Sequence, residues 1–174
     1  MGVLGAVANQ MDDTTNLDRL KAKMLEEIAT LEHELRNELP KEILKARAHG
    51  DLRENAEFHA AKDRQRYVDA RLSKLQARLS ELSLIDVTKI PRDRVGLGSR
   101  VLVLDVKKDE EIKYKLVASE ESDVANGLIS TSSPIGRSLL GRKVGDEVTF
   151  AIPGGQRTLE LLELKTIHEV DDVE

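Results

Sequence analysis

Apolar side chains recur every three or four residues from Leu17 to Ile43, a spacing that keeps them on one face of an α-helix. The stripe consists of Leu17, Leu20, Met24, Ile28, Leu31, Leu35, Leu39 and Ile43. Its steps of three, four and four residues from Ile28 to Leu39 depart from a heptad repeat, which predicts a locally relaxed supercoil. Pro40 removes a backbone donor inside the stripe, so we expect it to bend the helix, which then stops near Gly50.

A second apolar stripe follows and predicts another helix. Its positions alternate by four and three residues, with one polar intruder: Ala61, Gln65, Val68, Leu72, Leu75, Leu79 and Leu82. Each helix has about 30 residues and is therefore about 45 Å long. Two such helices bury their stripes against each other as an antiparallel coiled-coil hairpin with its tip at residues 49–54. The alternative is pairing between two chains, but the short connection favours the hairpin, and we expect a monomer.

Beyond residue 91 the pattern changes from helical to strand-like. Alternating or β-branched runs predict strands at residues 100–106, 113–118, 147–152 and 157–164. The Pro-Gly-Gly sequence at 153–155 predicts the hairpin turn between the last two strands. A short helix is predicted between the second and third strands, with Ser133 as N-cap, Pro134 in its first turn and Gly141 past its end. The expected fold class is therefore α+β.

These patterns divide the chain into four parts. Residues 1–16 show no periodicity and predict a flexible extension whose last polar residues cap the first helix. Residues 17–86 form the expected hairpin, and residues 92–170 form the small mixed domain. Residues 171–174 are an acidic tail.

Charge is distributed unevenly along the 174 residues, whose net charge is -5. Residues 41–78 hold ten Lys or Arg against six Asp or Glu, whereas both flanking segments are acidic. Such a basic block is either a solvated helix face or a surface for a polyanion. The chain has two Tyr, two Phe and no Trp, so stacking platforms for bases are scarce. It has no Cys, no basic leader and no long apolar run, so we expect a cytoplasmic protein without a membrane partner.

Asp51 and Glu54 stand three residues apart at the predicted start of the second helix. One interpretation is structural, because Asp51 suits an N-cap and Glu54 the third position of a capping box. The other is chemical. Two exposed carboxylates do not hold Mg²⁺ well alone, but they can complete a site supplied by a larger enzyme. Basic residues behind the tip would favour a nearby phosphate backbone; they are Lys41, Lys45, Arg47, Arg53, Lys62, Arg64 and Arg66.

The sequence ARAHGDLRENAEFHAAK at residues 46–62 resembles the tip signature of the Gre family of bacterial transcript-cleavage factors. A second similarity, to the family's carboxy-terminal domain, lies in ISTSSPIGRSLLGRKVGD at residues 129–146 and in PGG at residues 153–155. Together the resemblance covers about residues 17–168. The chain departs from the family at residues 1–16, which precede the usual start, at Leu39, where the family often has Arg, and in the loosely matching segment 116–123.

The resemblance implies that the hairpin enters the secondary channel of RNA polymerase, while an FKBP-like carboxy-terminal domain docks at the channel rim. Asp51 and Glu54 match the family's acidic pair, which helps the polymerase bind a second Mg²⁺ and position a water against backtracked RNA near its 3′ end. The polymerase would supply the remaining ligands, so the chain is a cofactor protein, not an enzyme. The tip match continues in Arg47, Asn55, Glu57 and Phe58, and the rim contacts correspond to Ser132, Ser133 and Pro134. Packing remains open for Phe58, as helix capping does for Ser133.

Three rival functions remain. A peptidyl-prolyl isomerase needs a pocket lined by aromatics, and the second domain offers only Tyr114 and Phe150. An inhibitory channel binder would share the architecture, but the intact acidic pair argues against it. A plain coiled-coil interaction module would make the acidic tip incidental. The four histidines are dispersed along the sequence, which favours solvated or packing roles over a metal site.

Overall fold

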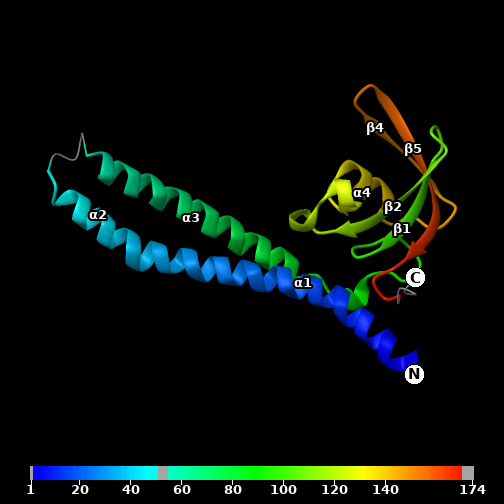
Figure 1. The fold of residues 1–174 in the computed structure, drawn as a ribbon, viewed down its shortest axis with the longest axis horizontal. Coiled ribbons are helices and arrows are strands. Elements are labelled where there is room, and N and C mark those ends of the chain that lie inside the picture. The colour runs from blue at the N-terminus through cyan, green and yellow to red at the C-terminus, as the bar shows by residue number, and fades with distance from the viewer. Residues whose placement is uncertain (1, 51–54, 170–174) are drawn as a thin grey trace. The chain divides into compact units, whose positions relative to one another are not determined.

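The computed structural model describes residues 2–50 and 55–169, and residues 2–15 as backbone only. Residues 16–85 form one compact unit, and the other described residues, 2–15 and 86–169, are grouped in a second. The first unit is a helical hairpin and the second contains a five-stranded mixed sheet (Figure 1). The fold is therefore α+β, as the sequence predicts.

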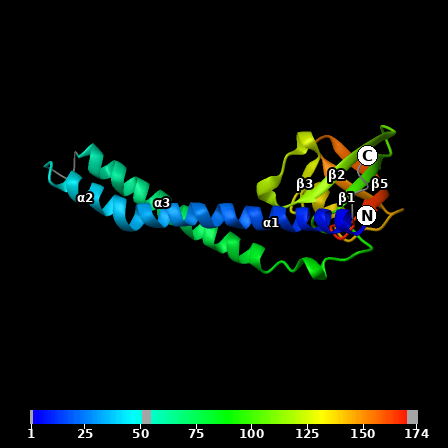
Figure 2. The same cartoon turned by 60° about the horizontal axis from the view of Figure 1, so that its bottom comes forward.

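The hairpin has two long arms that run side by side in opposite directions (Figures 1 and 2). The first arm consists of α1 (Gly2–His33), η1 (Glu34–Glu38) and α2 (Leu39–Arg47), and the second is α3 (Ala56–Ser83). Except for Ala46, the buried apolar residues of the two arms all belong to the predicted stripes: Leu17, Met24, Ile28, Leu31, Leu39, Ala46, Ala61, Val68, Leu72, Leu75 and Leu82. The other stripe residues are half-buried: Leu20, Leu35, Ile43, Gln65 and Leu79. The hydrophobic effect thus pairs the two stripes within one chain.

The irregular spacing in the first arm is concentrated in one π-helical turn, η1, where the backbone N–H of Leu39 donates to the carbonyl of Glu34, five residues earlier. A π turn holds one extra residue. It absorbs the consecutive four-residue steps and returns Leu39, only 1% exposed, to the buried seam. In a regular α-helix the ring of Pro40 would meet the carbonyl of Arg36. A wider turn thus lies directly before Pro40, the residue at which the sequence predicts a bend.

The two arms are also joined by ion pairs that set their register. Arg64 holds Glu34 through two hydrogen bonds of 2.7 and 3.0 Å, and Arg71 holds Glu27 through two of 3.0 and 3.2 Å. The two carboxylates are seven residues apart on one arm, and the two guanidinium groups are seven apart on the other. Exposed pairs of this kind contribute little stability each. Their spacing repeats every two helical turns, so a slipped pairing would separate both pairs.

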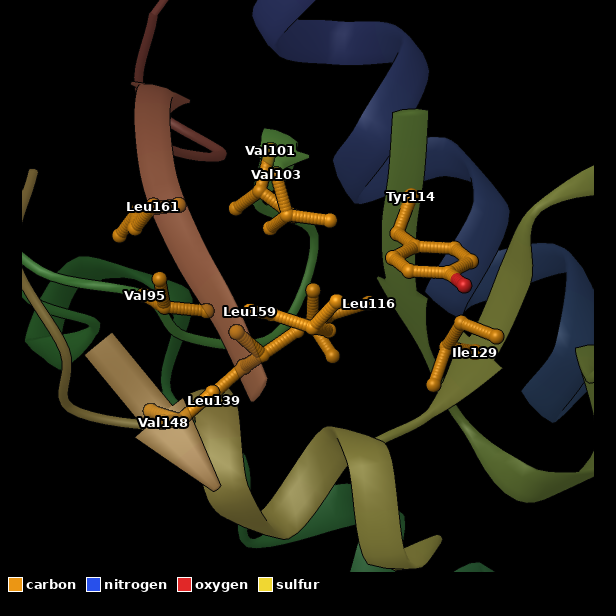
Figure 3. Close-up of a cluster of buried hydrophobic side chains, with 10 residues drawn as sticks. All are labelled: Val95, Val101, Val103, Tyr114, Leu116, Ile129, Leu139, Val148, Leu159 and Leu161. Carbon is orange, nitrogen blue, oxygen red and sulfur yellow. The ribbon is translucent and has the colours of Figure 1, made fainter. Parts of the chain in front are cut away.

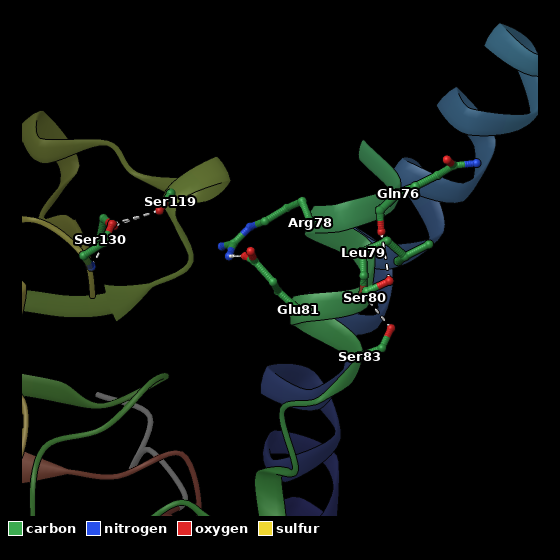
Figure 4. A network of polar contacts seen from close by, with 9 residues as sticks. Gln76, Arg78, Leu79, Ser80, Glu81, Ser83, Ser119 and Ser130 are labelled. Atoms are coloured by element: carbon green, nitrogen blue, oxygen red, sulfur yellow. Dashed lines mark hydrogen bonds and ion pairs between the residues drawn. The ribbon is translucent and has the colours of Figure 1, made fainter. Parts of the chain in front are cut away.

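Polar side chains near the end of α3 bond within their own helix (Figure 4). The hydroxyls of Ser80 and Ser83 donate to carbonyls four residues earlier, at 3.0 and 2.7 Å. Arg78 donates to Glu81 at 3.0 Å. Bonding of serine to its own helix satisfies the hydroxyl without a partner on another element.

The amino-terminal segment differs from the sequence-based expectation. We expected no regular structure before Leu17, whereas α1 begins at Gly2. The physical reason is that extending an existing helix fixes only one residue for each new hydrogen bond, whereas nucleation fixes several. A segment without an apolar stripe can therefore continue a helix that the buried residues after it already stabilise.

The second unit is built on a sheet with the strand order β3-β2-β1-β5-β4. Its strands are β1 (Arg100–Asp105), β2 (Glu110–Val117), β3 (Leu128–Ser130), β4 (Glu147–Ile152) and β5 (Gly155–Lys165). Neighbouring strands pair antiparallel except β2 and β3, which are parallel. The four predicted strands are confirmed. The fifth, β3, was not predicted because three residues are too few to show an alternating pattern.

Shorter elements complete the second unit. They are the 3-10 turns η2 (Val87–Lys89), η3 (Ser119–Glu121) and η4 (Val124–Asn126), and helix α4 (Pro134–Leu139). Helix α4 and one face of the sheet enclose a core of Val, Leu, Ile and a single Tyr (Figure 3). The side chain of Ser133 accepts a hydrogen bond of 3.1 Å from the backbone N–H of Gly136, which confirms the predicted N-cap.

Asp105 lies at the end of β1 and is only 2% exposed. Its contacts lead us to expect that the stability of the second unit falls in acid. Arg157 Nε donates to the Asp105 carboxylate at 2.9 Å, and the backbone N–H groups of Lys107 and Lys108 donate at 3.2 Å. The hydrogen bond from Arg157 lowers the pKa of Asp105, although burial opposes it. Because the folded pKa lies below the unfolded value of about 3.9, the stabilisation is present above pH 4 and is lost as pH falls through the folded pKa.

Asp105→Asn is therefore expected to lower the stability of the second unit at pH 7 and to flatten its pH dependence below about pH 4. The measurement is the urea midpoint of both proteins between pH 7 and pH 2. Asp93→Asn is the matched control: the pKa of this exposed carboxylate is also lowered, mainly by Arg94, but solvent screens the pair. Parallel acid loss in wild type and Asp105→Asn would contradict the expectation.

Candidate functional site

The candidate site is the end of the hairpin where the two arms meet. Asp51 and Glu54, the predicted acidic pair, lie outside the described residues, as does Arg53. The described residues Arg47, Asn55, Glu57 and Phe58 flank this segment on both arms. The contacts of these flanking residues define the geometry of the two arm ends.

Helix α2 ends at Arg47, and the chain then turns with backbone hydrogen bonds from Ala48 to Leu44 at 3.3 Å and from His49 to Ala46 at 3.2 Å. Gly50 follows with φ of +127°, a conformation that side-chain-bearing residues rarely adopt. The sequence thus places glycine where the chain leaves the first arm.

Helix α3 begins later than predicted, at Ala56, and its N-cap is Asn55. The Oδ1 atom of Asn55 accepts a hydrogen bond of 3.0 Å from the backbone N–H of Phe58. The capping role that the sequence also allowed for Asp51 is therefore filled by Asn55. The structural interpretation of the acidic pair loses its main support, because capping of α3 does not need Asp51.

The other end of the same amide reaches across the hairpin, where Asn55 Nδ2 donates to the carbonyl of Ala46 in the last turn of α2. Ala46 is 3% exposed and has a side chain small enough to let the two arms approach. Sequence reasoning missed this contact. The asparagine itself was the available signal, because an amide both donates and accepts.

Phe58 is half-buried and has a packing role. The guanidinium carbon of Arg47 lies 5.7 Å from the centre of the Phe58 ring, a cation–π contact between the arms. The ring of His59 meets the same phenyl edge-on at 5.7 Å. Glu57 is exposed in the first turn of α3, where a carboxylate suits the positive end of the helix dipole.

The cations behind the tip fall into two groups. Lys41, Lys45 and Arg47 are exposed on α2. The three on α3 have partners in the hairpin: Lys62 bonds Gln65 at 3.0 Å, Arg66 bonds Asp63 at 2.8 Å and Arg64 bonds Glu34. Arg64 and Arg66 are thus paired with carboxylates, whereas Lys62 bonds a neutral amide and keeps its charge, as do the exposed cations of α2.

Metal-binding side chains do not cluster in the described part of the chain, where no group of three or more His, Cys, Asp or Glu could hold an ion. His33 contacts Asn37 at 3.0 Å, and His168 contacts the carbonyl of Ile90 at 2.7 Å. The first contact lies within one helical arm and the second joins residues 78 apart in the sequence, and neither involves a second metal-binding side chain.

Ser132, Ser133 and Pro134 belong to the other compact unit. The hydroxyl of Ser132 lies 2.8 Å from that of Ser130 and 3.0 Å from that of Ser119. The Ser119 and Ser130 hydroxyls are 3.2 Å apart (Figure 4). Ser133 caps α4, whereas Ser132 and Pro134 are exposed and available to a partner.

The chain matches two family descriptions in sequence. Residues 19–83 match "Transcription elongation factor, N-terminal", and residues 90–166 match "Transcription elongation factor, GreA/GreB, C-term". Transcription elongation factor GreA of Nitratiruptor sp. is 48% identical over 133 residues, which are 75% of this chain and 82% of that protein. GreA of Desulfotalea psychrophila is 46% identical over 144 residues, which are 83% and 89% of the two chains.

Solved structures include a GreA/GreB factor from Nitrosomonas europaea, 29% identical, which covers 54% of this chain and 78% of its own with a TM-score of 0.39. In the described part of the chain, no helix has the length and apolar content needed to cross a membrane.

Proposed function

We propose a function for this chain on the basis of its family. The chain belongs to the GreA/GreB family of transcription elongation factors. Its partner is RNA polymerase. The hairpin enters the secondary channel of the polymerase and stimulates cleavage of backtracked nascent RNA near its 3′ end, which returns an RNA end to the active site. The polymerase performs the cleavage, and this chain supplies groups that the polymerase lacks.

The observation that carries the proposal is the position of the acidic pair. Asp51 and Glu54 fall between the end of α2 and the start of α3, within the region that matches the family's amino-terminal description. Helix α3 has 28 residues and a length of about 42 Å. A rod of this length, with a buried apolar seam and interhelical ion pairs, can carry two carboxylates into an enclosed site without bending.

Asp51 and Glu54 would contribute oxygen ligands to a Mg²⁺ that the polymerase holds with its own carboxylates. Mg²⁺ prefers six oxygens and is usually held by one or two carboxylates together with water and substrate phosphates, so two carboxylates from the tip fit a shared site. Held there, the ion would supply Lewis-acid chemistry that activates water and stabilises in-line displacement at the phosphodiester. The carboxylates orient that water, and the exposed cations of α2 face the phosphates of the RNA or the channel wall.

The second unit would hold the factor at the rim of the channel. Ser132 and Pro134 are exposed next to the Ser133 cap, so they can contact a partner while Ser133 keeps α4 in place. Ser132 and Pro134 would thus contact the partner and Ser133 would cap α4, two roles that the sequence alone did not divide among these residues.

Wild-type protein added with Mg²⁺ to stalled, backtracked elongation complexes is expected to shorten the RNA from its 3′ end. The products are separated by gel electrophoresis, with a complex in the forward register as the control. RNA of unchanged length would refute the proposal. Competition with another ligand of the secondary channel would then identify an inhibitory binder, and no competition would indicate an interaction module unrelated to the channel.

A further inference from the structure

The side chain of Asn55 bonds both arms of the hairpin at once. Its Oδ1 accepts from Phe58 N–H in the first turn of α3, and its Nδ2 donates to the carbonyl of Ala46 in the last turn of α2. The two bonds use both halves of one amide, and the side chain is half-buried between the helix ends. A capping residue needs only the first of these bonds.

The second bond acts on a group that the turn also uses. The Ala46 carbonyl accepts from His49 N–H at 3.2 Å, so it takes part both in the turn after α2 and in the contact with Asn55. The last carbonyls of a helix have no partner within it and fray unless another group bonds them. Asn55 therefore restrains the end of α2, which precedes the tip segment, and also caps α3, which follows it.

A second contact between the arms, that of Arg47 with Phe58, lies beside this hydrogen bond. Arg47 follows Ala46 in the sequence, and the backbone N–H of Phe58 donates to Asn55. The contact of Arg47 with Phe58 is a cation–π contact at 5.7 Å between exposed and half-buried groups, so it restrains direction weakly. A hydrogen bond is more directional. Of the two contacts between the arms at the tip, the hydrogen bond of Asn55 is therefore the more directional.

We propose that Asn55 is a positioning residue: it ties the ends of α2 and α3 together and so fixes the spacing of the two points between which the chain carries Asp51 and Glu54. The inference rests on the proposed function and deepens it. It gives Asn55 a role inside its own chain, in place of the polymerase contact that the resemblance implied. A carboxylate pair that must join an existing metal centre loses activity when displaced by about 1 Å, because catalysis depends on near-exact placement.

The substitution Asn55→Ser is expected to keep one of the two hydrogen bonds and to remove the other. Serine is as good an N-cap as asparagine, so the bond to Phe58 N–H is kept, but its hydroxyl is too short to reach the Ala46 carbonyl. The variant adds no charge next to the metal ligands. Leu75→Ala is the matched control, since it weakens the buried seam of the same hairpin far from the tip in sequence.

Cleavage of backtracked RNA is measured over a range of factor concentrations. Asn55→Ser is expected to lower the maximal rate at saturating factor by about 10- to 100-fold, with the half-saturating factor concentration changed less than about twofold. Its half-saturating Mg²⁺ concentration should rise. Leu75→Ala is expected to lower thermal stability and leave the maximal rate close to wild type. A maximal rate in Asn55→Ser equal to wild type, or one lowered equally in both variants, overturns the inference.

Hydrogen exchange of the free protein keeps this test separate from the test of function. The His49 amide, bonded to Ala46, should exchange faster in Asn55→Ser than in wild type and remain unchanged in Leu75→Ala. Without cleavage by the wild type, the proposed function fails, and this exchange alone decides whether Asn55 ties the arms. Equal exchange in Asn55→Ser and wild type overturns the inference.

Discussion

Replacing Asp51 by Asn, or Glu54 by Gln, is expected to reduce stimulated RNA cleavage by about 100-fold or more while leaving polymerase binding largely intact. Each substitution keeps the size of the side chain and removes its negative charge. A neutral amide is a much weaker Mg²⁺ ligand than a carboxylate, so the shared site loses an interaction worth several kcal/mol in the transition state. The rate is measured on backtracked complexes at saturating factor, and binding by competition with labelled wild type.

Asp63→Asn is the control for this experiment. Asp63 is another exposed carboxylate on α3, but it is paired with Arg66 at 2.8 Å and lies behind the tip. Its loss is expected to change the cleavage rate less than about twofold, since exposed pairs contribute little. Cleavage at the wild-type rate in both Asp51→Asn and Glu54→Gln would show that the acidic pair takes no part in the reaction.

Gly136→Ala is expected to destabilise the second unit by about 3 kcal/mol or more, although alanine is the better helix former. Gly136 is buried in α4, and an added Cβ would overlap the carbonyl oxygen of Ser130 and stand 2.9 Å from its carbonyl carbon. The obstacle is backbone, so no side-chain rotation relieves it. That carbonyl also accepts the Ser133 hydroxyl at 2.6 Å, so moving it disturbs the α4 cap. Thermal unfolding and exchange of the sheet amides measure the loss.

Gly141→Ala separates steric overlap from backbone strain. Gly141 has φ of +78° with nothing within 4 Å of an added Cβ, so its substitution costs only about 1 kcal/mol. A smaller loss in Gly136→Ala than in Gly141→Ala would mean that α4 moves away from β3 more readily than its packing indicates.

Much of the site was predictable because it is built from local patterns. The two stripes indicated a hairpin, and its tip followed from the short connection between them. The position of Asn55 beside the acidic pair was also visible. The pair of hydrogen bonds that its side chain makes was not, because one partner, Ala46, lies nine residues away and becomes a neighbour only when the arms are paired. For the same reason, the structural interpretation considered an N-cap at Asp51, four residues before Asn55, which caps α3.

The sequence by itself determined the elements whose signals repeat over short distances: the apolar stripes, the four alternating strands, the Ser133 cap and the glycine turns. Tertiary structure decided what depends on residues far apart in the chain. It placed the π turn before Pro40, because Leu39 must reach α3. It paired β3 in parallel with β2, packed Gly136 against Ser130 and tied Asn55 to Ala46. The physical reason is that periodicity records burial on one face, whereas hydrogen bonds and steric limits between elements exist only once those faces have met.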